Sequence, residues 1–168
     1  VTGVQTCALP ISLERLLKHM AWANDKVYTA AESLPDDALG SFLVNPEWTA
    51  GRLLEHIVGG ATWYVHRLTG KPWTEIPFPK SSTDIPHLKK MLAGFDAEIL
   101  ACLEEGEGTV IEEINGKEVV RKRSTILSQA VHHATEHRAQ LIDALEFKGF
   151  PIINLDSIDL WSYESAVG

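Results

Sequence analysis

Apolar residues recur at steps of three and four along most of the chain, a spacing that places them on one face of a helix. This pattern predicts four long helices, which loops rich in proline, glycine and aspartate connect. The expected helices cover residues 12–34, 49–70, 84–103 and 124–149. Ser12 and Thr49 stand where N-caps are expected, and Gly149 stands where the end of a helix favours glycine.

The period of the pattern changes between the third and fourth expected helices. Two runs that contain β-branched residues, 110–114 and 117–120, flank the dipeptide Asn115-Gly116. Such a dipeptide is typical of a type I′ turn, which predicts a two-stranded hairpin that the helices support. Residues 150–168 form a tail with one short helix expected around 157–165. The expected fold is all-α, a four-helix bundle with a small β-hairpin between helices 3 and 4.

The composition is that of an ordinary globular protein. Of the 168 residues, 45% are hydrophobic and 23% are charged, which excludes a disordered chain or a collagen and fits one domain. The net charge of −8 argues against nucleic acid and anionic membranes as partners. The two cysteines imply no disulfide framework. Since no apolar run approaches the ~18 residues of a membrane span, a cytoplasmic location is expected.

The first residues require separate treatment. Residues 1–11 carry no charge and look like the in-frame translation of a sequencing adapter. We interpret them as a non-native scar and exclude them from the reasoning about the fold. Residues 12–168 are then expected to form a single domain.

Seven histidines are the unusual feature of the composition. His133 and His137 are four residues apart, which places them one turn apart on one face of the fourth helix, where two imidazoles can bind one ion. His56, on the second helix, has Gly60 one turn away, and a glycine there leaves space near the imidazole of His56. Three histidines from two facing helices would form a three-ligand metal site with an open position. The alternative is that the pair of His133 and His137 arises by chance and that His56 is a hydrogen-bonded core or boundary histidine.

Several short segments carry a family resemblance. They are Trp22-Ala23-Asn24, Leu54-Glu55-His56, Trp63-Tyr64, His133-Ala-Thr-Glu-His137-Arg138-Ala-Gln140 and Asp156-Ser-Ile-Asp159-Leu. With these segments, spread over about residues 13–160, the chain resembles the DinB/YfiT-like family of metal-binding four-helix bundles. One departure is Ala139, where many members have glycine, and a small residue is kept.

The resemblance implies an up-down-down-up bundle that holds a divalent metal through His56, His133 and His137. Zinc and nickel are the favoured ions, and imidazole ligands suit both. The resemblance also implies chemistry with low-molecular-weight thiols such as bacillithiol or mycothiol, because characterised relatives are thiol S-transferases and isomerases. Many other members have no known reaction.

The neighbours of the three histidines have open interpretations. Arg138 is expected either to reach a substrate carboxylate or thiol, or to anchor its helix by pairing with acids. Gln140 shares the face of the ligands and is a candidate to orient one of them through a hydrogen bond. Trp63 and Tyr64 are more often core than pocket residues, and Trp48 is a candidate for the mouth of a pocket.

The segment that ends at His137 also matches the His-x-x-Glu-His motif of inverzincin proteases, with Glu136 as general base. That class needs a further acidic ligand well downstream and a larger catalytic domain, so we favour a solvated or ligand-supporting Glu136. The acids of residues 104–113 are expected on a solvated face: Glu104, Glu105, Glu107, Glu112 and Glu113. The other histidines are expected at the surface or its boundary: His19, His66, His87 and His132.

The leading functional hypothesis is a metal-dependent S-transferase-like enzyme in which a coordinated thiol loses its proton and attacks an electrophile. Water in place of the thiol would allow hydrolysis. The alternative is a non-catalytic metal-binding or stress-response bundle, which is expected to have a fourth protein ligand. A purely structural bundle without metal is the third hypothesis. We expect a small-molecule substrate and a homodimer.

Overall fold

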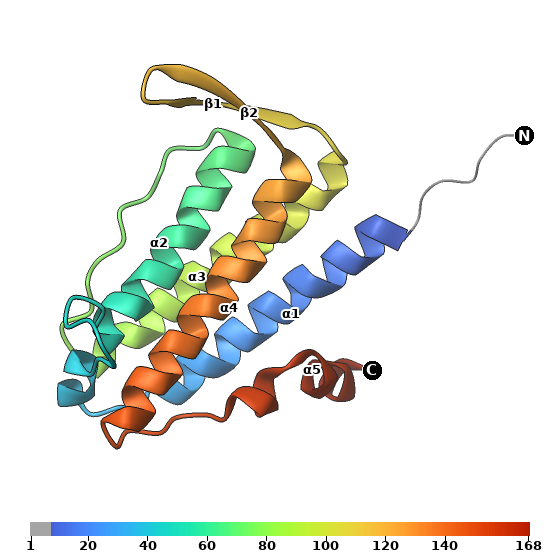
Figure 1. Ribbon diagram of the computed structural model, residues 1–168. Coiled ribbons are helices and arrows are strands. Elements are labelled where there is room, and N and C mark those ends of the chain that lie inside the picture. Colours follow the sequence, from blue (N-terminus) through green and yellow to red (C-terminus); the bar gives the residue numbers. More distant parts are fainter. Residues whose placement is uncertain (1–7) are drawn as a thin grey trace, which may run out of the picture.

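The computed structural model describes residues 8–168, with side chains for residues 12–113 and 115–168. Its long helices are α1 (Ala8–Ala31), α2 (Ala50–Thr69), α3 (Ile85–Ala101) and α4 (Arg123–Phe147). Helices α1 and α4 run in one direction, and α2 and α3 run in the opposite direction (Figure 1). The connection after α2 returns along the bundle to the start of α3, which makes these neighbours parallel. The predicted all-α bundle with up-down-down-up order is confirmed.

The helix ends follow the local sequence. The Thr49 hydroxyl accepts a hydrogen bond from the backbone N–H of Arg52 at 3.2 Å, so this residue caps α2 as predicted. Gly70 ends the same helix with φ of 73°, a left-handed conformation that glycine adopts without strain. The start of α1 was predicted wrongly, because this helix begins at Ala8 rather than after Ser12.

The interpretation of residues 1–11 as a scar stays a prediction. Residues 1–7 lie outside the described residues, and residues 8–11 lie within α1. None of the described helices is long and apolar enough to cross a membrane.

The core lies between the four long helices. Helix α1 packs against α3 and α4, and α2 packs against the same two helices from the other side. The Tyr28 side chain of α1 is completely buried, and its hydroxyl donates a 2.6 Å hydrogen bond to the carbonyl of Leu54 in α2. This bond joins the diagonal pair of helices, so the apolar core is also fixed by a polar contact.

The predicted hairpin consists of β1 (Thr109–Ile114) and β2 (Lys117–Lys122), which pair antiparallel. Asn115 and Gly116 both have positive φ, at 53° and 74°, as a type I′ turn requires. Glu112 was expected on a solvated face and is instead buried. Its carboxylate accepts a hydrogen bond from Arg121 Nε at 3.0 Å and lies 3.6 Å from Arg67 Nε of α2. The hairpin is therefore attached to the bundle through a buried carboxylate.

The tail folds back along α1 and ends in α5 (Leu160–Val167). His19 of α1 was expected near the surface, yet it is buried, and its Nε2 donates a 2.8 Å hydrogen bond to the carbonyl of Ile158. Burial lowers the pKa of His19, which favours the neutral ring. The rings of Trp22 and Tyr163 lie 5.5 Å apart beside it, so aromatic packing holds α5 on the first helix.

Candidate metal centre

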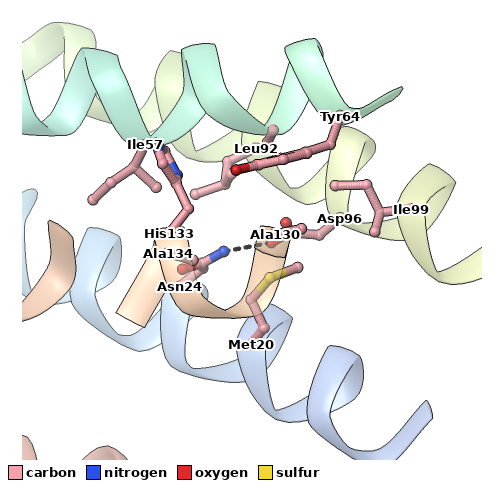
Figure 2. Close-up of a pocket in the computed structure, with 11 residues that line it drawn as sticks. Met20, Asn24, Ile57, Tyr64, Leu92, Asp96, Ile99, Ala130, His133 and Ala134 are labelled. Carbon is pink, nitrogen blue, oxygen red and sulfur yellow. Dashed lines mark hydrogen bonds between the residues drawn. The ribbon is translucent and has the colours of Figure 1, made fainter. Parts of the chain in front are cut away.

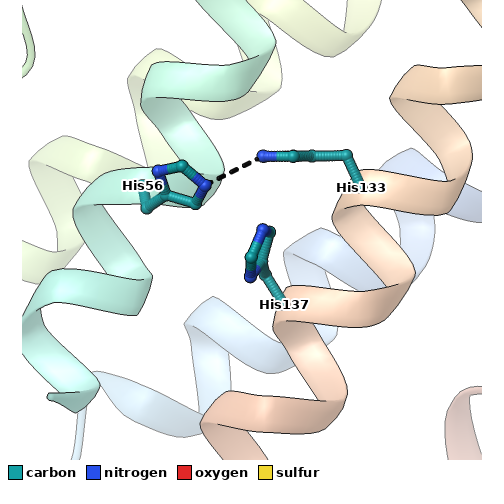
Figure 3. A group of neighbouring side chains, drawn as sticks. All are labelled: His56, His133 and His137. Atoms are coloured by element: carbon teal, nitrogen blue, oxygen red, sulfur yellow. Dashed lines mark hydrogen bonds between the residues drawn. The ribbon is translucent and has the colours of Figure 1, made fainter. Parts of the chain in front are cut away.

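The three predicted ligands converge between α2 and α4. His56 extends from α2, and His133 and His137 extend from successive turns of α4 toward it (Figure 3). One nitrogen from each ring lies within 4.8 Å of the other two. The Nε2 atoms of His56 and His133 are 3.1 Å apart and share a hydrogen bond. The structure thus brings together side chains that are 77 residues apart in sequence.

Gly60 provides the space for one of these rings. A Cβ atom at this position would lie 2.2 Å from Cε1 of His133 and 2.7 Å from its Nδ1. A glycine inside a helix costs ~1 kcal/mol relative to alanine. Glycine occupies this position, where any larger residue would collide with His133. Free space beside His56 was expected from the sequence, and the structure shows that the ring of His133 fills it.

Gln140 fixes the orientation of His137. The Gln140 Oε1 atom accepts a 2.8 Å hydrogen bond from Nδ1 of His137. Because Nδ1 carries the proton, the neutral ring has the lone pair on Nε2, which is the form that binds a metal ion. Its position in the sequence made Gln140 a candidate for this hydrogen bond, and the effect of the bond on a bound metal ion stays a prediction.

Trp48 covers the cluster from the loop that precedes α2. Its ring stacks on His137, with centroids 5.5 Å apart and an interplanar angle of 8°. It also meets the ring of His56 edge-on, at 4.9 Å. Trp48 is partly exposed, so it both restricts the two rings and borders the solvent. Its role at the mouth of a substrate pocket stays a prediction.

Two of the three rings are held in the neutral state. Burial is the main cause that lowers the pKa of His56 to about 4, with the proximity of His137 and Arg52 as further causes. The pKa of His133 is lowered to about 4 as well, mainly by burial and then by the other two histidines. Both rings are therefore uncharged near pH 7, so a metal ion does not have to compete with a positive charge on either ring.

The donor set fits a divalent transition metal. Three imidazole nitrogens suit zinc, copper, iron or nickel, and three protein ligands are typical of zinc sites that keep a position for substrate. In the described part of the chain, no other group of three or more histidine, cysteine or acidic side chains is arranged in this way.

Arg138 does not reach this centre. Its guanidinium is buried, and Nη1 donates a 2.6 Å hydrogen bond to Oδ1 of Asn24 in α1. The Nδ2 atom of Asn24 in turn donates to Asp96 of α3 at 2.9 Å. Arg138 therefore joins three helices through a polar chain that ends on an acid. The anchoring interpretation agrees with this structure, and contact with a substrate does not.

Asp96 was missed by the sequence analysis. The carboxylate is buried, and within the described residues its Oδ1 atom has no hydrogen-bond partner. It borders a cavity of about 10 Å³, the size of one water molecule. Figure 2 shows the Asn24–Asp96 hydrogen bond at one side of this cavity and His133 at another. The polar chain thus ends close to a candidate metal ligand.

The other residues that the sequence analysis singled out are not members of the histidine cluster. Trp63 is exposed on α2, where the guanidinium of Arg67 lies 4.7 Å from its ring. Tyr64 is buried beside it, and its ring meets that of His133 at 5.7 Å. Glu136 is exposed on α4 and is not part of the histidine cluster, which does not support a role as the general base of a protease.

Comparison with known proteins agrees with the fold and the cluster. The sequence model of the DinB family matches residues 8–164, which include all three histidines and the whole of the four long helices. No curated protein matches the chain. Because the family model covers nearly the full length, the chain belongs to the DinB family.

Proposed function

We propose that the protein binds one divalent metal ion, zinc or nickel, through His56, His133 and His137. The observation that carries the proposal is the convergence of three imidazole nitrogens within 4.8 Å. The hydrogen bond from His137 to Gln140 and the space at Gly60 support it, because both features orient rings toward a common point. Membership of the DinB family is compatible with this function.

Metal analysis of the purified protein tests this proposal. We expect about one ion per chain in the parent protein and none in the double variant His56→Ala/His133→Ala. The matched control is His132→Ala, which removes an exposed histidine on the same helix and should keep the ion. A parent protein that stays free of metal after incubation with zinc and with nickel would overturn the proposal.

We further propose that the centre activates a small thiol for transfer to an electrophile. A bound ion of this kind lowers the pKa of a coordinated thiol or water, so that the nucleophile is present near pH 7. The protein residues hold three coordination positions, which leaves room for the nucleophile. Trp48 shields one side of the cluster and Gln140 keeps His137 in the metal-binding tautomer.

The reaction is tested with 1-chloro-2,4-dinitrobenzene as electrophile, with and without a small thiol such as cysteine. We expect turnover that requires the thiol and that His133→Ala abolishes. Turnover without thiol that is also lost in His133→Ala would replace transfer by hydrolysis. Full metal occupancy without turnover of several electrophiles would point to a non-catalytic metal-binding protein.

A further inference from the structure

A cavity of about 380 Å³ opens directly beside the candidate metal centre. It lies between the loop that precedes α2 and the second half of α4, and it shares Trp48, His137 and Gln140 with the centre. The volume falls in the range of cavities that bind small molecules. A molecule in this cavity would therefore reach the histidine cluster at its His137 side.

Much of the lining of this cavity is apolar. Leu43 and Val44 contribute side chains from the loop, and both are exposed, Val44 at 85%. Leu53 and Ala144 form the buried part of the wall. A ligand that covers Leu43 and Val44 gains hydrophobic free energy in proportion to the area removed from water, so the cavity favours a molecule with an apolar body.

Among the described residues that line the cavity, Asp143 is the only acid, and none is a lysine or an arginine. Asp143 of α4 lines the cavity and is exposed, and within the described residues its carboxylate forms no ion pair or hydrogen bond. The nearby cations are directed elsewhere. Arg52 pairs with Glu55 at 2.5 Å, and the Lys148 ammonium lies over the ring of Phe42 at 4.7 Å. A carboxylate with no lysine or arginine among the described lining residues favours a positively charged ligand and disfavours a carboxylate.

Two amides of the lining hold fixed positions. The side-chain oxygen of Asn45 accepts a hydrogen bond from the backbone N–H of Glu47 at 3.0 Å. The oxygen of Gln140 is bonded to His137. Each amide oxygen therefore already accepts one hydrogen bond, whereas the Asp143 carboxylate accepts none within the described residues. His137 and Asp143 are six positions apart, about 9 Å along the helix axis at ~1.5 Å per residue.

We propose that this cavity binds a small molecule that has an apolar body and a basic amine, with the amine at Asp143. The opposite end of the molecule faces His137. The placement of that end rests on the proposed metal-dependent function, whereas the preference for an amine does not.

The preference of the cavity for an amine over a carboxylate is measured first on the metal-free, chelator-treated protein. Calorimetric titrations compare 2-phenylethylamine, 2-phenylethanol and phenylacetate, which differ mainly in charge. We expect the amine to bind about five-fold more tightly than phenylacetate, a modest ratio because an exposed carboxylate is well screened. In Asp143→Asn the ratio should fall to about one, while binding of 2-phenylethanol stays unchanged.

Two further variants control this comparison. Glu146→Gln removes an exposed acid of the same helix that does not line the cavity, and it should keep the preference for the amine. Val44→Ser should weaken all three ligands because it removes apolar surface from the wall. Equal affinity for amine and carboxylate in the parent protein, or a preference that persists in Asp143→Asn, would overturn the proposal.

A second titration tests the proposed amine site and the proposed thiol chemistry separately. In cobalt(II)-loaded protein, a coordinated thiolate gives a sulfur-to-cobalt charge-transfer band. We expect this band at lower concentrations of 3-aminopropanethiol than of 3-mercaptopropionate. If no thiol gives the band and the metal-free protein still prefers the amine, the thiol chemistry is wrong and the amine site stands. If a thiol gives the band but the metal-free protein shows no preference for the amine, the amine site is wrong and thiol binding at the centre stands.

Discussion

Gly60 is the residue whose absence of a side chain matters most for the candidate centre. In Gly60→Ala the new Cβ would lie 2.2 Å from Cε1 of His133, so the ring must leave its present position. We expect metal affinity to fall at least ~10-fold, a size known for changes that misorient a ligand, with helix content unchanged in circular dichroism.

The neighbouring glycine supplies the control for this prediction. At Gly59 a Cβ would have nothing within 4 Å, so Gly59→Ala should keep metal affinity and raise the free energy of unfolding by up to ~1 kcal/mol. Equal metal affinity of the two alanine variants would contradict the role assigned to Gly60.

Gln140 allows a second prediction at the residue scale. Gln140→Ala removes the acceptor for Nδ1 of His137, and loss of such a partner typically lowers metal affinity ~10- to 100-fold. Gln140→Glu keeps an acceptor oxygen and should retain affinity within a few-fold of the parent. Competition with a chromophoric chelator measures both variants, and equal affinities would show that the hydrogen bond has no influence on the centre.

The residues of the centre were predictable because helical spacing defines a face. The four-residue step from His133 to His137 and from His56 to Gly60 places each pair on one side of a helix, whichever helix lies opposite. Asp96 had no such signal, because its partners are on α1 and α4 and no local pattern in α3 indicates them. For Asn24 a signal existed, since it interrupts the apolar face of its helix.

At the scale of elements, the chain from Arg138 through Asn24 to Asp96 joins α4, α1 and α3. Burial of charges is costly unless they are paired and hydrogen-bonded. Here the pairing passes through a neutral amide, and the pKa of Asp96 is raised to about 6, with burial as the main cause against the opposing effects of Asn24 and Arg138. The acid thus makes the packing of three helices sensitive to pH.

The raised pKa of Asp96 therefore predicts how the free energy of unfolding depends on pH. An unfolded aspartate has a pKa of about 3.9, so the folded state binds this proton more tightly than the unfolded state. The contribution of Asp96 to stability is complete below about pH 4 and is lost as the pH rises through the folded-state pKa of about 6. In Asp96→Asn this loss, on the order of 2 kcal/mol, should disappear.

Urea unfolding of metal-free protein between pH 4 and pH 7 measures the effect. The free energy of unfolding of the parent minus that of Asp96→Asn should fall across this interval. Asp37→Asn is the control, because this acid is exposed and its side chain forms no hydrogen bond or ion pair within the described residues, and its difference from the parent should show no comparable fall. A constant difference for Asp96→Asn would mean that this group does not titrate in the interval.

The hairpin shows which features of an element can be predicted from its local sequence. The turn at Asn115 and Gly116 was predictable because both conformations are encoded by the dipeptide itself. The burial of Glu112 was not, since it depends on Arg67, a residue on a helix that precedes the hairpin by two elements. Its local sequence, with another glutamate beside it, is typical of a solvated strand.

At the scale of the whole molecule, the order of the helices could be predicted and the docking of the tail could not. The apolar faces and the loops predict four helices in a bundle, and the parallel pair α2 and α3 was implied by the family resemblance. The position of α5 depends on the contact of His19 with Ile158, 139 residues later. Nothing in the sequence near either residue indicates that contact.

The response of the whole molecule to metal removal is the last prediction. Residues from all four long helices form the apolar core, and the three candidate ligands come from α2 and α4 alone. We therefore expect the chelated protein to stay folded, with unchanged helix content.

The bound metal ion should nevertheless stabilise the folded state. A metal that binds only the folded state, at 100 times its dissociation constant, adds about 2.7 kcal/mol to the free energy of unfolding. This corresponds to a rise in melting temperature of roughly 5–10 °C for a chain of this size. The rise should be absent in His56→Ala/His133→Ala and present in His132→Ala. Unfolding upon chelation would instead show that the ion is part of the structural core.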